Sequence, residues 1–155
     1  GKWVASIVKK SLPGWGDRVW ELRATAEGFK EGNVWDDSGT LGVDSGQLGF
    51  FDEASYRDKF VATSDDINKA SDEITWADND PFYKVCCSLT LSDVRAGTFS
   101  IGVVSSSGLG DGAYDVFIKK DKDGLASNIK VVFITDEDAT DNEDVWRESD
   151  GLPGV

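Results

Sequence analysis

Residues 105–116 read Ser105-Ser106-Ser107-Gly108-Leu109-Gly110-Asp111-Gly112-Ala113-Tyr114-Asp115-Val116, which is a Ser/Gly-rich loop between two strand-like runs. Glycine reaches the positive φ angles that a sharp corner needs, and Asp hydrogen-bonds its own turn. Further on, residues 113–119 and 128–134 alternate apolar and polar side chains on either side of Asp123-Gly124. This pattern is typical of an antiparallel hairpin. The stretch therefore predicts a corner that leads into a β-hairpin.

The rest of the chain is organised in the same way. The 17 glycines and six tryptophans in 155 residues favour a turn-rich β protein over a helical bundle. One amphipathic helix is predicted over residues 64–75, with Ser64 as its N-cap and Ile67, Ala70 and Ile74 on one apolar stripe. The sequence thus predicts a mostly β fold, either an antiparallel β-sandwich or a strongly bent sheet, with about seven or eight strands and one short helix. The further strands are expected at residues 3–9, 18–25, 41–43, 47–52, 85–91 and 99–104.

The domain organisation follows from where the strand pattern stops. Residues 1–134 are predicted to form a single β-rich domain, because a chain of this length can bury one ordinary core. Residues 135–155 form a predicted acidic C-terminal tail, with Trp146 as its main apolar anchor.

The charge of the chain limits its partners. The formal net charge is −13, and nucleic-acid binders depend on clustered Lys and Arg, so no nucleic-acid binding is expected. An acidic surface suits a basic protein partner, a divalent cation or solubility alone. A protein that mimics DNA, with carboxylates spaced like phosphates over one face, is a further hypothesis.

The absence of histidine excludes several kinds of active site. The sequence contains no His, so Ser-His-Asp and Cys-His constellations and the His ligands of catalytic zinc cannot form. Its two cysteines, Cys86 and Cys87, are adjacent within an apolar run, which predicts buried free thiols rather than a disulfide framework.

No segment approaches the roughly 18 apolar residues of a membrane-spanning helix, and no signal peptide is visible. The chain is therefore expected to be soluble and to have no membrane partner. It begins at Gly1 and contains no Met, so a processed leader would be invisible, and its location is left unknown.

The Ser/Gly loop does not match a cofactor signature. Gly108 to Gly112 lacks the spacing and the following helix of a phosphate-binding loop, and no cofactor is expected. Residues 119–130 resemble an EF-hand only superficially, because Lys119 and Lys130 stand where calcium ligands are needed. A calcium site assembled between loops remains open, with ligands drawn from Asp36, Asp37, Asp44 and Asp111.

Paired carboxylates raise the possibility of glycoside hydrolysis. Asp44, Asp52, Glu53 and Asp111 are the candidates, but sequence gives no separation between them. Tryptophans on a β scaffold also permit sugar stacking. Trp3 and Trp20 fit core positions, whereas Trp15, Trp35 and Trp76 lie in predicted loops.

Two segments carry a resemblance to a known family. Residues 43–52, VDSGQLGFFD, and residues 106–116, SSGLGDGAYDV, resemble the paired signatures of an uncharacterised β-rich family found in bacteria and phages. The resemblance implies no activity, cofactor or catalytic residue. It does imply that the two segments belong together, so that Asp111 and Tyr114 lie near residues 44–47.

The sequence therefore favours a non-enzymatic structural or protein-interaction module with an acidic surface, within a larger assembly in one variant. The alternative is a small-ligand or carbohydrate-binding domain, with hydrolase activity as a further option, and whether the chain is an enzyme is left uncertain. No catalytic residue is assigned. The ligand-binding candidates for the alternative are Asp44, Ser45, Gln47, Asp111 and Tyr114.

Overall fold

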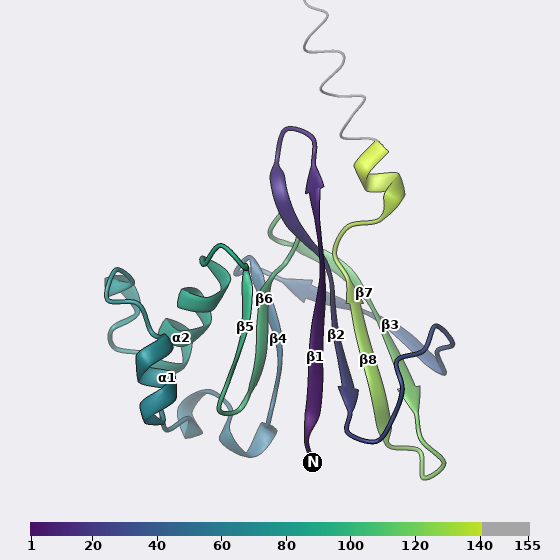
Figure 1. Ribbon diagram of the computed structural model, residues 1–155, viewed down its shortest axis with the longest axis horizontal. Coiled ribbons are helices and arrows are strands. Elements are labelled where there is room, and N and C mark those ends of the chain that lie inside the picture. Colours follow the sequence, from purple (N-terminus) through teal and green to yellow (C-terminus); the bar gives the residue numbers. More distant parts are fainter. Residues whose placement is uncertain (141–155) are drawn as a thin grey trace, which may run out of the picture.

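The computed structural model describes residues 1–140 and has the predicted mostly β fold (Figure 1). Its strands are β1 (Trp3–Leu12), β2 (Gly16–Ala26), β3 (Asp37–Val43), β4 (Gln47–Phe51), β5 (Ala96–Phe99), β6 (Gly102–Ser106), β7 (Gly112–Lys120) and β8 (Ala126–Val132). Its helices are α1 (Ser64–Lys69) and α2 (Pro81–Thr90), together with three short 3-10 turns, η1 (Glu53–Ser55), η2 (Arg57–Lys59) and η3 (Thr75–Ala77), and residues 136–140 are helical as well.

The strands form two antiparallel sheets. Sheet A has the order β1-β2-β8-β7-β3, and sheet B has the order β4-β6-β5. Because β8 returns to pair with β2, the last strand lies beside the second one, and β1 is left at the edge of sheet A. Helices α1 and α2 lie on the sheet B side of the molecule (Figure 1).

The core has two main parts. Between the sheets, Leu22 and Val131 are fully buried and pack in one cluster with Val103 of sheet B. On the other face of sheet B, Val104 packs in a second cluster with Val85 of α2. Successive residues of β6 thus serve the two clusters, as the alternation of side chains along a strand requires.

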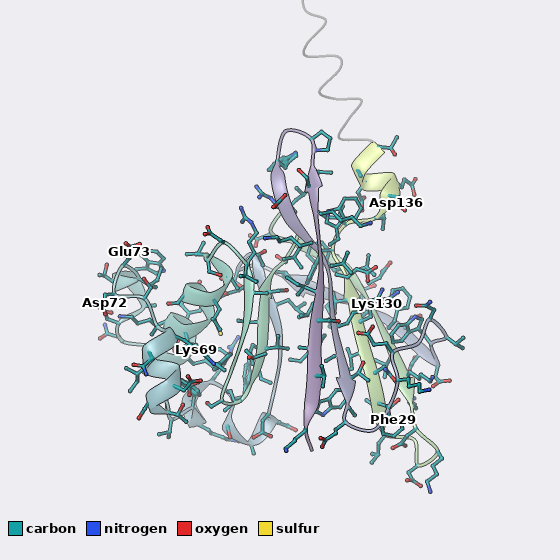
Figure 2. All side chains as sticks on the ribbon, in the orientation of Figure 1. Phe29, Lys69, Asp72, Glu73, Lys130 and Asp136 are labelled. Atoms are coloured by element: carbon teal, nitrogen blue, oxygen red, sulfur yellow. The ribbon has the colours of Figure 1, made fainter. Side chains whose placement is uncertain are left out.

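The predicted helix at residues 64–75 is wrong in its extent. Helix α1 ends at Lys69 (Figure 2), and its N-cap is Thr63, whose side chain accepts from the backbone N–H of Asp66. Of the predicted apolar stripe, Ile67 is 63% exposed, whereas Ile74, which lies beyond the helix, is buried. The capping box fixes the start of the helix, but only Asp66 is buried within it, so packing does not extend it further.

The predicted strand at residues 85–91 is also wrong, because this segment belongs to α2. Asp80 caps the helix by accepting from the N–H of Tyr83 at 3.0 Å, and Pro81 occupies the first turn. Phe82, Val85 and Cys86 are buried on one helical face. Their i, i+3, i+4 spacing is the helical period, which overrides the apolar run that suggested a strand. Helix α2 is therefore an α-helix that the sequence pattern does not predict over residues 85–91.

The extended run predicted at residues 99–104 is interrupted by a turn. Phe99 pairs with Gly102, so β5 and β6 form a tight hairpin. A side chain at Gly102 would approach the carbonyl oxygen of Phe50 to 2.1 Å, which explains why this position needs glycine.

The predicted β7–β8 hairpin is confirmed. Its turn is held by Asp121, whose Oδ1 accepts from the N–H groups of Asp123 and Leu125, and Gly124 has a φ of 79°. After β8, Ala139 packs against the inter-sheet cluster. Trp146 and the rest of the predicted acidic tail from residue 141 onward lie outside the described residues. The division at residue 134 stays a prediction.

Candidate functional site

The two signature segments form the corner at which a two-stranded ladder passes from sheet A to sheet B. In sheet A, β3 pairs with β7 as far as Val43 and Gly112. In sheet B, β4 pairs with β6 from Gln47 and Ser106 onward. Residues 44–46 and 107–111 connect these ladders, so both strands change sheet at the same place. Bends of this kind make the corners of β-sandwiches.

Hydrogen bonds between the two segments replace the interrupted ladder. Gly46 donates its N–H to Oδ1 of Asp111 at 2.8 Å and accepts from the N–H of Ser107 at 3.0 Å. Gly46 has a φ of 65°, in the left-handed region that favours glycine. The prediction that Asp111 lies near residues 44–47 is confirmed, and its carboxylate acts as a backbone acceptor.

Tyr114 ties the second segment together from within. Its hydroxyl donates to the carbonyl of Gly110 at 2.5 Å and lies 3.1 Å from the carbonyl of Ser107. Its ring stands edge-on to Phe133. Burial is the main cause that raises the pKa of Tyr114, and the nearby Asp111 carboxylate adds to it. The tyrosine therefore stays neutral and holds the loop shape.

Gly108 explains the close packing of this loop. Its φ is 60°, and a Cβ atom there would lie 2.9 Å from Cβ of Phe133 and 3.0 Å from Cγ1 of Ile134. The loop can lie this close to the strand end only because residue 108 has no side chain.

A cavity of about 580 Å³ opens beside the first corner segment, and we call it the corner cavity. Three of the five predicted ligand-binding residues, Asp44, Ser45 and Gln47, line it, but Asp111 and Tyr114 do not. Its other walls include four aromatic residues and two charged ones, namely Phe51, Tyr56, Phe82, Tyr83, Glu53 and Arg57.

The polar groups of the corner cavity are partly engaged. Gln47 accepts from the hydroxyl of Thr90 at 3.1 Å, so its amide is fixed toward α2. A hydrogen bond to Cys87 is the main cause that raises the pKa of Tyr83, and the negative charge of Asp44 contributes. Burial raises the pKa of Cys86 to about 12. A thiol with this pKa is protonated at neutral pH and is a poor nucleophile.

A second space, the inter-sheet cleft, has a volume of about 660 Å³ and is lined by both sheets. Trp3 and Ala5 of β1 contribute from sheet A, and Phe50 contributes from sheet B. Asp52 and Glu53 line it as well, and both are exposed. Trp3 was predicted to lie in the core, but it is 42% exposed, because β1 is the edge strand of sheet A.

The backbone of β1 has a free edge beside this cleft. The N–H of Glu27 donates to the carbonyl of Lys2, in register with the pairing of Trp3 with Ala26. Because backbone groups alternate along an antiparallel strand, Val4, Ser6 and Val8 face β2. The N–H and C=O groups of the residues between them face away from the sheet. We call these the edge-facing residues: Trp3, Ala5 and Ile7.

Part of this edge lacks the usual protection, although the β1–β2 register shifts beside it, between Val8 and Lys9. No charge, Pro or Gly occurs between Trp3 and Val8, although natural sheets normally protect an exposed edge with one of these or with a bulge or cover. Further along β1, the Nζ of Lys9 donates to the carbonyl of Asp93 at 2.9 Å, which brings a loop against the strand. The open part of the edge is therefore the segment from Trp3 to Ile7.

Among residues 1–140, no group of three or more Cys, Asp or Glu side chains is arranged to hold a metal ion. Calcium binding between loops stays a prediction. Within the same range, no helix has the length and apolar character required to cross a membrane.

The chain matches the family described as "Protein of unknown function (DUF4241)". The match covers residues 19–131, from β2 to β8, and includes both corner segments. Strand β1 lies before the matched range. No curated protein and no solved structure is significantly similar to the chain.

Proposed function

The chain belongs to the DUF4241 family of proteins of unknown function, and we propose that it is a non-enzymatic protein-interaction module that binds an extended, basic segment of a partner at the free edge of β1. The observation that carries this proposal is the row of edge-facing residues beside the inter-sheet cleft. Main-chain hydrogen bonds to such an edge supply affinity, and pockets for alternate side chains supply specificity.

The lining of the inter-sheet cleft favours particular side chains in the added strand. On the face of β1 that carries Trp3 and Ala5, an added strand would place every second residue toward the cleft. The apolar walls suit a β-branched or aromatic side chain, and Asp52 and Glu53 suit Lys or Arg. The net charge of −13 favours the approach of a basic segment from a distance.

The test uses two peptide probes, acetyl-Lys-Val-Lys-Val-Lys-Val-amide and its Glu-Val counterpart, with binding followed by NMR at the edge-facing amides. We expect the Lys-Val peptide to bind and the Glu-Val peptide to bind at least roughly tenfold more weakly. Ala5→Pro removes one edge-facing N–H that β2 does not use, so it should abolish binding and leave the fold intact.

Ala5→Val is the matched control, since it keeps the N–H and the cleft leaves room beside residue 5. The proposal is contradicted if the Lys-Val peptide shifts no edge-facing amide, or if Ala5→Pro binds it as well as Ala5→Val does.

The corner cavity supports a second candidate, small-ligand or carbohydrate binding. Its volume of about 580 Å³ lies in the range of ligand pockets, and Asp44, Ser45 and Arg57 offer polar groups beside aromatic walls. The test is NMR titration with chitotriose and cellotriose against the wild type and Tyr83→Ala. Shifts confined to the cavity and lost in the variant would support this candidate, and unchanged spectra with both sugars would oppose carbohydrate binding.

A further inference from the structure

We propose that the segment that adds to β1 is β1 of a second copy of this chain, so that two copies join their A sheets about a twofold axis at Ala5. This inference rests on the proposed function, because it identifies the partner at the same edge. A strand that pairs antiparallel with its own copy is related to it by a twofold axis, so both copies use the same surface.

The composition of β1 matches what its own cleft requires. Residues 1–12 contain three lysines, Lys2, Lys9 and Lys10, and no acidic residue, although the chain as a whole is strongly acidic. The segment between these lysines is rich in β-branched and aromatic side chains. Strand β1 is therefore itself a basic, extended segment with apolar side chains.

The alternation of backbone groups selects one register. Edge-facing residues must pair with edge-facing residues, because only they have free N–H and C=O groups. A single register pairs all three with one another: Ala5 lies opposite Ala5 of the second copy, and Trp3 lies opposite the second copy's Ile7. Each Trp3–Ile7 pair joins an aromatic to a β-branched side chain, which is a favourable cross-strand combination.

The charges fit this register as well. Lys2 would lie opposite Val8 of the second copy, and Lys9 would lie opposite Gly1, so no two lysines face each other. Gly1 lines the inter-sheet cleft with Asp52 and Glu53, so the backbone of the second copy's Lys9 would lie near these carboxylates, while its Nζ donates to the carbonyl of Asp93 in its own chain. The added strand would also cover Trp3 and Val4, which are 42% and 69% exposed.

Cysteine cross-linking tests the register directly. Two directly opposed Ala5 residues would have Cα atoms about 5.5 Å apart, which is within reach of a disulfide. Two Val4 residues would lie diagonally, roughly 8 Å apart, which is too far. Ala5→Cys at about 1 mM protein should therefore form a covalent dimer under mild oxidation, and Val4→Cys should not.

Val4→Cys is a stringent control, because Val4 is the more exposed of the two positions and a random collision would favour it. The wild type controls for Cys86 and Cys87, both of which are buried. A dimer yield for Val4→Cys that equals or exceeds that of Ala5→Cys contradicts the inference.

Sedimentation of the wild type and the peptide experiment separate this inference from the proposed function. If Ala5→Cys gives no dimer and the wild type is monomeric at all concentrations, the second copy is excluded as the partner. In that case the proposed function stands if the Lys-Val peptide still binds and Ala5→Pro abolishes its binding. If neither the peptide nor a second copy adds to β1, both proposals fail.

Discussion

The carboxylate of Asp111 accepts a hydrogen bond of 2.8 Å from the backbone N–H of Gly46, which lies 65 residues earlier in the chain. This contact joins the two signature segments at the point where the strands pass from one sheet to the other. Asp111 therefore acts on the shape of the corner, and through it on the position of Asp44 and Ser45 in the corner cavity.

Removal of the Asp111 carboxylate should loosen this corner. Asp111→Ala is expected to lower the free energy of unfolding by about 1 kcal/mol, because the N–H of Gly46 loses its acceptor. Asp111→Asn keeps an acceptor oxygen and should lose less. Urea denaturation measures both, with Asp123→Ala in the β7–β8 turn as the control. Equal stabilities for Asp111→Ala and the wild type would show that the bond contributes nothing.

The two glycines Gly108 and Gly124 allow steric contact to be separated from backbone strain. Both have positive φ angles, 60° and 79°, but only at Gly108 would a Cβ atom meet other side chains. Gly108→Ala should therefore cost about 2 to 4 kcal/mol of stability, whereas Gly124→Ala should cost about 1 to 2 kcal/mol. If both variants lose the same amount in thermal unfolding, the packing of the loop on Phe133 and Ile134 is not what requires glycine.

The ionisation of the Asp66 carboxyl should make the free energy of unfolding depend on pH. Burial raises the pKa of this carboxyl, but hydrogen bonds from Ser100 and Thr63 outweigh it and hold the pKa below the usual 3.8. A lowered pKa in the folded state means that the carboxylate stabilises the fold above about pH 4 and that this contribution disappears as the pH falls further.

The stability difference between the wild type and Asp66→Asn should therefore shrink between about pH 5 and pH 2 in denaturation experiments. Asp65→Asn is the matched control, because Asp65 is next to Asp66 in the sequence and its own side chain is 72% exposed. A difference for Asp66→Asn that stays constant over this interval would mean that its ionisation is not linked to folding.

Cys86 should be inert in the folded protein. With its pKa raised to about 12 by burial, the thiol is neither ionised nor accessible at pH 8. Iodoacetamide should label it only after denaturation, as read by mass spectrometry of the peptide that contains it. Rapid labelling at native pH would indicate that α2 opens away from sheet B.

Much of the fold could be predicted because its signals are local. In the β7–β8 hairpin, apolar and polar side chains alternate on both sides of the Asp123-Gly124 pair. The alternation and the turn pair can both be recognised within a few residues of the turn. Helix α2 was missed although Phe82, Val85 and Cys86 carry a helical period, because the adjacent apolar residues of 85–91 also resemble a buried strand. Periodicity alone cannot separate a helix from a buried strand in an apolar run of this length.

The candidate site could be predicted only in part. The two signature segments indicated that Asp111 lies near residues 44–47, but not that its carboxylate accepts from a backbone N–H. The free edge of β1 could not be predicted, because it depends on the order of strands in the sheet. In the structure, β8 lies between β2 and β7, which leaves β1 at the edge of the sheet and Trp3 exposed. The sequence alone does not give this order.

The most direct test of the central claim, that the edge of β1 is the binding surface, is residue-resolved hydrogen exchange of its amides. In dilute protein, the N–H groups of Val4 and Ser6 should be protected by β2, whereas those of Trp3, Ala5 and Ile7 should exchange rapidly. Addition of the Lys-Val peptide, or an increase in protein concentration, should then protect the edge-facing amides selectively. If these three amides exchange equally fast after the peptide is added and after the protein concentration is raised, the account is contradicted.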